Sequence, residues 1–375
     1  MTPPPDPTDA ADGTPHSSPS RRVERGRGAT FNPANRFRRD TREACDDGWA
    51  GDGEDEALPP LATTVTVQPA RTIIARNDSP DIPFDRSINP YQGCEHGCVY
   101  CYARPSHAYH DLSPGLDFET RLFAKPAAAE LLRRELARPG YACAPIALGT
   151  NTDPYQPVER DWRITRSVLE VLAECEHPFT IVTKSALVER DLDLIAPMAA
   201  KGMARVYLSV TTLDGALARA MEPRAAAPRR RLRTIAALSA AGVPAGVMVA
   251  PLIPQLNDRD LEAILEAAAA AGARHAGWVM LRLPREVAPL FRDWLHVHRP
   301  LRAAHVMSLV RQVHGGRDYD ATFGVRQRGR GEIAQLVARR FAIACRRLRL
   351  DGERAALDTS RFRPPRSRGG QLDLF

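Results

Sequence analysis

Residues 94–101 of this chain read CEHGCVYC and hold three cysteines with the spacing C-x3-C-x2-C. Disulfide frameworks use cysteines in pairs, and a closed structural zinc site uses four protein ligands. Three thiols on one short loop instead leave one position of a metal centre open to a ligand that is not protein. The spacing therefore predicts that Cys94, Cys98 and Cys101 bind a metal.

The residues alone allow two kinds of metal at this loop. A 4Fe–4S cluster takes four thiolates when it is fully ligated, so three thiolates would leave one iron open. Zinc with three protein ligands is the alternative, and His96 is a fourth candidate ligand inside the loop. Because Cys94, His96, Cys98 and Cys101 are crowded for a closed tetrahedral site, we expect His96 to hydrogen-bond to the loop instead.

The composition limits the class of protein. The chain has 375 residues, of which 43% are apolar, so it can bury a sizeable core. A net charge of +7 favours an anionic partner, although such a surface is often only solvated. Seven cysteines, an odd number, are typical of a reducing cytoplasm rather than of a disulfide framework. We see no signal peptide and no apolar run long enough to cross a bilayer, so we expect no membrane partner.

Hydrophobic patterning between residues 71 and 284 indicates an α/β fold. The predicted strands are residues 86–90, 146–149, 179–183, 205–210, 245–250 and 277–281. The predicted helices between them are residues 127–137, 165–175, 192–202, 229–242 and 260–272. This alternation favours parallel strands with right-handed crossovers, and the spacing favours a partial (β/α)6 barrel. A doubly wound sheet is the competing architecture.

The flanks of this region differ from it in composition. Residues 1–60 are rich in Pro, Gly, Asp and Arg, which predicts a poorly ordered arm of low complexity. Within that arm, the basic run at 21–39 either neutralises the acidic run at 40–56 or touches nucleic acid. Residues 285–352 form a predicted helical extension, with helices at 286–296, 300–314 and 332–348, and residues 353–375 form a predicted flexible tail.

Polar residues follow the predicted strands at their C-terminal ends, where α/β folds bind ligands. Thr150, Asn151 and Asp153 follow the second strand, Lys184 follows the third, and Ser209 lies in the fourth. Helix capping is the alternative explanation for such residues. It does not explain Lys184, because a lysine at the mouth of an apolar strand is costly unless it meets an anion.

Residues 71–284 resemble the radical S-adenosylmethionine (SAM) superfamily, in which C-x3-C-x2-C with an aromatic before the third cysteine follows the first barrel strand. The segments NPYQGCEHGCVYCYARP, GTNTDPYQPVE, VTKS, SVTTLD, EPRA and APLIPQLND are similar to the branch related to spore photoproduct lyase. The resemblance implies an enzyme in which the three cysteines hold a 4Fe–4S cluster and SAM chelates the open iron. It also implies an electron donor such as flavodoxin or ferredoxin.

The resemblance assigns further residues to SAM. Tyr100 is expected against the adenine, and Lys184 is expected at the carboxylate. Thr150, Asn151 and Asp153 are expected at the amino group or the ribose, and Ser209 is expected to hydrogen-bond SAM from the fourth strand. These residues are expected to bind the cofactor, and the resemblance leaves the catalytic side chains unassigned.

The sequence departs from the lyase pattern at one position. Lyases of this branch place a hydrogen-donating cysteine at the end of the second strand, where this chain has Gly149. The nearest cysteine, Cys143, precedes that strand. We therefore expect a nucleic-acid lesion or modification as the substrate, but not repair of spore photoproduct by that route. A peptide or protein side chain is the alternative substrate, and a non-catalytic zinc protein that binds nucleic acid is the alternative class.

The last residues of the chain, QLDLF, resemble the short motif by which bacterial repair proteins dock on the replication sliding clamp. In that mode Gln371 would bond at the edge of the pocket, and Leu372, Leu374 and Phe375 would fill an apolar cleft on either side of Asp373. The alternative is that these side chains fold back onto the barrel. Docking on the clamp would favour DNA over peptide as the substrate.

Overall fold

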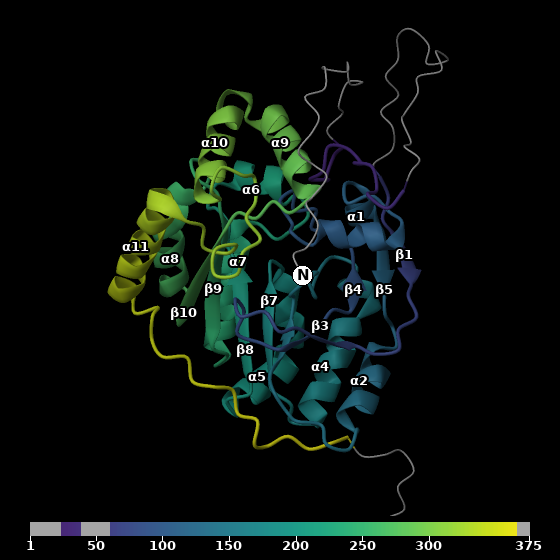
Figure 1. The fold of residues 1–375 in the computed structure, drawn as a ribbon. Helices are drawn as coiled ribbons and strands as arrows, with labels where there is room; N and C mark the ends of the chain where they lie inside the picture. The colour runs from purple at the N-terminus through teal and green to yellow at the C-terminus, as the bar shows by residue number, and fades with distance from the viewer. Residues whose placement is uncertain (1–23, 39–60, 366–375) are drawn as a thin grey trace, which may run out of the picture.

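The computed structural model describes residues 24–38 and 61–365 (Figure 1). Its main feature is a seven-stranded sheet in which only the edge strand β2 runs antiparallel. The strands in sheet order are β10 (His275–Met280), β9 (Ala245–Leu252), β8 (Ala204–Ser209), β7 (Phe179–Thr183), β6 (Ile146–Leu148), β3 (Arg86–Ile88) and β2 (Ile74–Arg76). The six parallel strands overlap the six that the sequence predicts, so the partial (β/α) barrel is confirmed.

Helices follow the parallel strands and cover the outer face of the sheet. They are α2 (Ala128–Leu136), α4 (Ile164–Glu174), α5 (Leu192–Ala200), α7 (Pro228–Ala240) and α8 (Leu261–Ala270). Each overlaps a predicted helix, because its apolar residues recur at helical spacing and are buried against the sheet. In α4, for example, Val168, Leu169 and Leu172 are fully buried.

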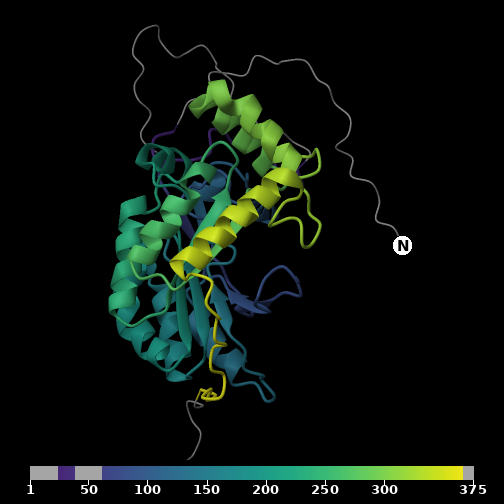
Figure 2. The same ribbon diagram turned by 90° about the vertical axis from the view of Figure 1, so that its left-hand side faces the viewer.

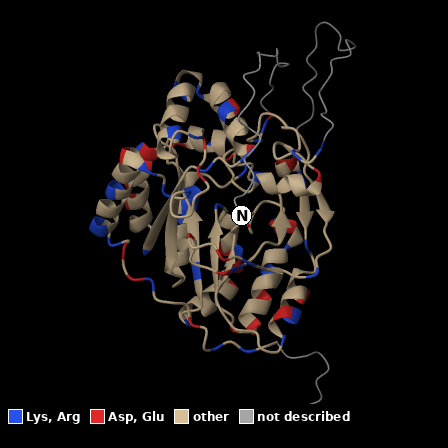
Figure 3. Ribbon diagram, in the orientation of Figure 1, with Lys and Arg blue, Asp and Glu red and all other residues tan. Residues whose placement is uncertain are grey.

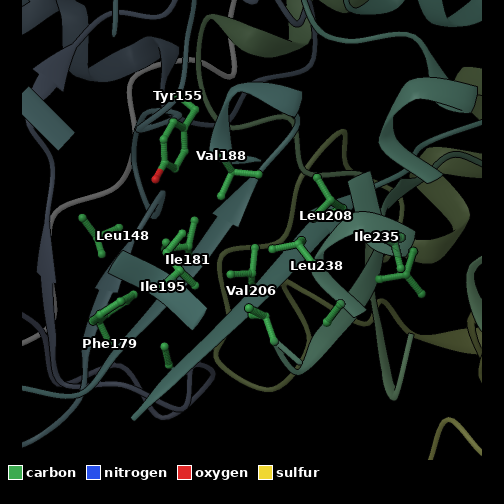
Figure 4. Packing of buried hydrophobic residues seen from close by; sticks show 14 of the residues in the cluster. Leu148, Tyr155, Phe179, Ile181, Val188, Ile195, Val206, Leu208, Ile235 and Leu238 are labelled. Atoms are coloured by element: carbon green, nitrogen blue, oxygen red, sulfur yellow. The ribbon is translucent and has the colours of Figure 1, made fainter. Parts of the chain in front are cut away.

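The core lies between the sheet and these helices (Figure 4). Val206 and Leu208 of β8 belong to the same buried cluster as Ile235 and Leu238 of α7. Successive strand residues point to opposite faces, so alternate residues of a strand reach the helices. Ser209, the residue after Leu208, therefore points to the inner side of the barrel, where ligands of such barrels bind.

Two loops bridge the opposite edges of the sheet. Asp81, in the turn between β2 and β3, accepts hydrogen bonds from the backbone N–H of Gly324 (2.6 Å) and from Nε of Arg326 (2.5 Å). The loop that carries Arg326 also lies along the other edge, where the N–H of Met280 in β10 donates to the carbonyl of Gln327 (2.8 Å). The sheet is therefore curled far enough for its edges to be joined by side chains.

The free edge of β10 is covered by arginines rather than by another strand. Arg354 donates to the carbonyl of Ala276 (2.7 Å), and Arg328 donates to the carbonyl of Trp278 (2.8 Å). Unpaired carbonyls on an edge strand would otherwise be open to pairing with another chain. The contact of Arg354 fixes the segment after residue 350 against the barrel, and that of Arg328 fixes the loop before residue 331.

The C-terminal extension consists of α9 (Val287–His298), α10 (Ala303–Val313) and α11 (Gly331–Leu348), each of which overlaps a predicted helix (Figure 2). Helix α11 packs on α8 through apolar contacts and through the ion pair of Arg340 with Glu262 (2.7 Å). Figure 3 marks both basic and acidic residues on the ribbon of these two helices. No helix among the described residues combines the length and the apolar character that a bilayer span requires.

A second sheet of three short strands was not predicted. It consists of β1 (Thr64–Val67), β5 (Arg121–Ala124) and β4 (Tyr91–Gln92), in that order. Strand β1 is mostly exposed, and although its residues TVTV alternate, four residues are too short a run to mark a strand in the sequence. The sheet matters for function because β4 leads directly into the cysteine loop.

Candidate active site

The cysteine loop lies between β4 and a 3-10 helix, η1 (Arg104–His110), near the C-terminal ends of the parallel strands. Cys94 and Cys98 are 7% and 8% exposed, Cys101 is half-buried, and all three thiols are free. Burial raises the pKa of Cys98 to about 12 and holds that of Cys94 well above its ordinary value. The unligated loop therefore favours the protonated thiols of Cys94 and Cys98, and a bound metal would deprotonate them.

The three sulfur atoms do not form a single-ion site. No three His, Cys, Asp or Glu side chains among the described residues converge closely enough to hold one metal ion. One zinc ion would need such convergence. In an iron–sulfur cluster each thiolate binds a different iron, so the ligands of a cluster stand further apart. Three cysteine thiols on one loop are the kind of donor that iron–sulfur clusters take.

Two residues from the turn after β6 hold the cysteine loop in place. The side-chain oxygen of Gln156 accepts from the N–H of Glu95 (2.9 Å), and its amide group donates to the carbonyl of Gly93 (3.1 Å). Asp153 lies 3.3 Å from Nδ1 of His96, which is 2% exposed. His96 is thus tied to a carboxylate from another strand rather than to the backbone of its own loop.

Asp153 is occupied by donors from its own turn and from β7 as well. Its carboxylate accepts from the N–H of Tyr155 (2.9 Å), the hydroxyl of Thr183 (2.6 Å) and the N–H of Lys184 (2.7 Å). These bonds and His96 hold the pKa of Asp153 at about 2, although burial alone would raise it. The residue joins the ends of β6 and β7 to the cysteine loop.

The turn itself has an unusual backbone. Gly149 has a φ of +88°, and a Cβ at this position would lie 2.0 Å from the carbonyl oxygen of Val182. Only glycine fits such a conformation without strain. Beyond it, Oδ1 of Asn89 accepts from the N–H of Asn151 (3.1 Å), and the hydroxyl of Tyr102 donates to the carbonyl of Thr150. The cysteine of the lyase pattern is therefore sterically excluded here.

A buried ionic network lies beside the loop and was missed in the sequence. Glu222 is 2% exposed and accepts from the hydroxyls of Tyr100 and Thr211, while Arg231 pairs with its other oxygen. Arg231 also donates to the carbonyl of Ser209 (2.9 Å). Burial would raise the pKa of Glu222, but Arg231 and Lys184 hold it at about 2. The hydroxyl of Tyr100 is thereby fixed, and its ring orientation with it.

Lys184 brings a positive charge to this network. Its Nζ lies 5.8 Å from the centre of the Tyr100 ring, within reach of a cation–π contact. Burial lowers the pKa of Lys184, but Cys98 and Glu222 oppose this effect and raise it overall. The ammonium group thus stays charged beside the ring of Tyr100 and the thiol of Cys98. The geometry brings Lys184, Tyr100 and the cysteine loop together at one end of the barrel.

The segments that carry these residues are visible in the sequence, but their pairing is not. Glu222 and Arg231 lie in the segments EPRA and RRRLR, and Gln156 is the last residue of DPYQ, but nothing in these segments reveals a buried partner. Cys143 and Cys175 lie away from the loop, before β6 and after α4.

Comparison with known proteins agrees with these features. The family model of the radical SAM superfamily matches residues 88–268. The uncharacterized protein Rv2578c of Mycobacterium tuberculosis is 40% identical over 233 residues, which cover 62% of this chain and 68% of that protein. The uncharacterized protein MJ0683 of Methanocaldococcus jannaschii is 27% identical over 171 residues, which cover 46% of this chain and 61% of that protein.

Solved structures of spore photoproduct lyase share the fold. A complex with dinucleoside spore photoproduct superimposes with a TM-score of 0.54 at 15% identity, and covers 76% of this chain and 78% of that chain. A variant bound to AdoMet and the dinucleoside gives the same TM-score of 0.54. The family match and the mycobacterial relative assign this chain to the radical SAM superfamily of enzymes, and the solved structures show that it shares the fold of spore photoproduct lyase.

Proposed function

We propose that Cys94, Cys98 and Cys101 hold a 4Fe–4S cluster with one iron open to SAM. The observation that carries the proposal is a set of three free thiols on one loop within the matched radical SAM region. When bound, the cluster and SAM supply a 5′-deoxyadenosyl radical that takes a hydrogen atom from the substrate. The chain's own part is to hold the thiols, orient SAM and exclude water.

The side chains around the loop divide these tasks. We propose that Lys184 binds the carboxylate of SAM and that the fixed ring of Tyr100 lies against its adenine. Ser209, Thr150 and Asn151 are the proposed polar contacts. Because the oxygens of Asp153 already accept from Thr183, Lys184 and Tyr155, Asp153 serves SAM by fixing the turn that carries Thr150 and Asn151.

Anaerobic reconstitution tests the cofactor proposal. The wild-type protein is expected to take up about four irons and to form 5′-deoxyadenosine when it is reduced with SAM. Replacing any of the three loop cysteines with Ala should abolish iron binding. The matched control is Cys143→Ala, which should keep the wild-type iron content because Cys143 lies away from the loop. One tightly bound zinc ion and no iron would contradict the proposal.

A nucleic-acid lesion or modification is the proposed substrate. The support is the fold shared with a lyase solved together with a dinucleoside lesion, and a net charge of +7. A target base in duplex DNA would have to leave the stack to reach the radical. Because Gly149 excludes the lyase cysteine, we propose that the product radical is quenched by another donor than in that lyase.

The substrate class can be tested through SAM cleavage. We expect UV-irradiated oligonucleotides to increase the formation of 5′-deoxyadenosine over the rate without substrate, and untreated oligonucleotides to have less effect. Deuterium from a labelled oligonucleotide should appear in the 5′-deoxyadenosine. Stimulation by a peptide mixture and by no nucleic acid would establish the peptide alternative instead.

Two partners are proposed from the sequence. An electron donor such as flavodoxin or ferredoxin would reduce the cluster. The QLDLF motif at residues 371–375 lies outside the described residues, and its likeness to clamp-binding peptides supports docking on the bacterial sliding clamp. A peptide of residues 366–375 should bind purified clamp, and removal of Leu374 and Phe375 should abolish binding without changing the iron content. Equal binding by the intact and truncated proteins would contradict this proposal.

A further inference from the structure

The part of the N-terminal arm that the structure describes is packed against the cysteine loop. Residues 24–38, which composition assigns to a poorly ordered and basic arm, run beside α1 (Asp117–Thr120) and reach α9 (Figure 1, purple). Arg27 is 6% exposed and Ala29 is 1% exposed. A basic arm that awaited nucleic acid would present its side chains to solvent, so this burial needs another explanation.

One buried carboxylate joins this segment to the cysteine loop. Glu119 is fully buried and accepts from the backbone N–H groups of Gly28 (2.9 Å) and Ala29 (2.8 Å). The same carboxylate pairs with Arg104, whose Nε donates to the carbonyl of Cys98 (3.0 Å). The segment therefore bonds to Glu119, and the cysteine loop bonds to Arg104, the ion-pair partner of Glu119. Hydrogen bonds to a buried charge are among the strongest in proteins.

The two backbones also touch directly. A Cβ on Gly28 would lie 1.8 Å from the carbonyl oxygen of Gly97 and 3.3 Å from the backbone nitrogen of Val99. Gly97 lies between the first two cysteines of the loop, and Val99 lies between the second and the third. No side chain fits between the segment and the loop, so a glycine is required at position 28.

A second connection runs from the segment to the residue after Cys94. Arg27 donates to the hydroxyl oxygen of Thr63 (3.1 Å) and to the carbonyl of Glu119 (3.0 Å). Thr63 in turn donates to the carboxylate of Glu95 (2.5 Å). These hydrogen bonds connect Arg27, through Thr63, to Glu95 near the start of the cysteine loop.

The far end of the segment is anchored as firmly. The amide of Asn35 donates to the carbonyls of Ala108 (3.0 Å) and Leu112 (3.1 Å). Thr30 donates to Asp293 of α9, and Arg36 pairs with Glu286 (2.9 Å). The segment is thus tied at both ends and crosses the cysteine loop between them.

We propose that residues 27–35 are a strap that positions the cysteine loop and shields its thiols, and with them the cluster, from solvent. The strap replaces the nucleic-acid contact that the basic composition suggested for this part of the arm, because Arg27 and Arg36 are already engaged within the protein. The shielding of the cluster rests on the function proposed above. The shielding of the thiols does not, since it can be measured in the protein without iron.

Thiol alkylation in the iron-free protein tests the strap directly. In Gly28→Val the side chain would collide with Gly97, so the strap cannot seat. We expect iodoacetamide to modify Cys94 and Cys98 at least about tenfold faster than in wild type, which corresponds to about 1.4 kcal/mol of lost protection. Mass spectrometry resolves each site, and the distant Cys175, 1% exposed, serves as an internal reference. Arg25→Ala, on the exposed part of the segment, is the matched control and should behave as wild type.

A change in alkylation at Cys175 would indicate global unfolding, and Asn35→Ala then decides the question. That variant frees the far end of the strap without touching the loop, and should raise alkylation of Cys94 and Cys98 in the same direction but less. If Gly28→Val stays folded, alkylation of Cys94 and Cys98 at the wild-type rate would overturn the proposal. If Gly28→Val unfolds, the same result in Asn35→Ala would overturn it.

The second measurement uses reconstituted protein in air. Gly28→Val should lose the visible absorbance of its cluster at least about tenfold faster than wild type, the same loss of protection as in the alkylation test. Equal rates of loss would show that the strap does not shield the cluster. If the wild type takes up no iron, the function proposed above fails, while the alkylation test still decides whether the strap protects the loop.

Discussion

The side-chain oxygen of Gln156 accepts a 2.9 Å hydrogen bond from the backbone N–H of Glu95, the residue that follows Cys94. Gln156 is fully buried, and its amide also donates to the carbonyl of Gly93. One side chain from the turn after β6 therefore satisfies a donor and an acceptor on either side of Cys94. The position of Cys94 therefore depends on a side chain that bonds to the backbone on either side of it.

Gln156→Ala should loosen the cysteine loop. The change leaves a buried N–H and a buried carbonyl without partners, each of which costs about 1–3 kcal/mol. We expect a lower free energy of unfolding in denaturant titration of the iron-free protein, and lower iron retention after gel filtration. Gln312→Ala, an exposed glutamine in α10, is the control and should change neither. Unchanged iron retention in Gln156→Ala would contradict the positioning role.

The strands and helices of the barrel could be predicted, but the residues that hold its site could not. Val206 and Leu208 mark β8 because alternating or continuous apolar runs are a local signal. The partners of Glu119 at Gly28 and Ala29 lie 91 and 90 residues away, so no local pattern connects them. The cysteine loop is visible for the opposite reason, since its three candidate ligands lie within one short segment.

Gly149→Ala should destabilise the protein without removing any contact. The backbone φ of +88° is strained for residues with a side chain, and the added methyl would meet the carbonyl of Val182. We expect a loss of about 1–3 kcal/mol in the free energy of unfolding. Gly352→Ala, where an added Cβ meets nothing within 4 Å, is the matched control. A Gly149→Ala protein as stable as wild type would mean that the turn can rearrange.

Stability should fall at acidic pH through His177. Its ring is fully buried, with Nε2 2.9 Å from the hydroxyl of Tyr141, and burial lowers its pKa from 6.5 to about 4. Between these values the unfolded chain binds a proton that the folded chain does not. The contribution of neutral His177 to the free energy of unfolding is therefore complete above pH 6.5. As the pH falls toward 4, the free energy of unfolding decreases by about 3 kcal/mol through this group.

The variant His177→Gln isolates this contribution, because it removes the titrating group and keeps a polar side chain. Denaturant titrations at several pH values should show the stability of the wild type falling more steeply than that of the variant below pH 6.5. His107, whose pKa burial also lowers to about 4, contributes the same slope to both proteins, so only their difference is diagnostic. Parallel curves would show that protonation of His177 is not coupled to unfolding.

Lys184→Ala should weaken SAM binding and leave the iron content intact. Lys184 lies beside the ring of Tyr100 and keeps its charge, and no salt bridge to a carboxylate of the described residues occupies its ammonium group. A hydrogen bond to a charged group contributes about 1.5–3 kcal/mol, so the dissociation constant for SAM should rise by roughly tenfold to a hundredfold. Equilibrium dialysis of reconstituted protein with labelled SAM gives this constant directly. Lys201→Ala is the control, since Lys201 pairs with Glu176 outside the site and its loss should leave the constant unchanged. The ratio of iron to protein separates the possible outcomes, because a variant that lost its cluster would also lose SAM. Normal iron with unchanged SAM affinity would mean that Lys184 serves only to balance the charge of Glu222 and to pack against Tyr100.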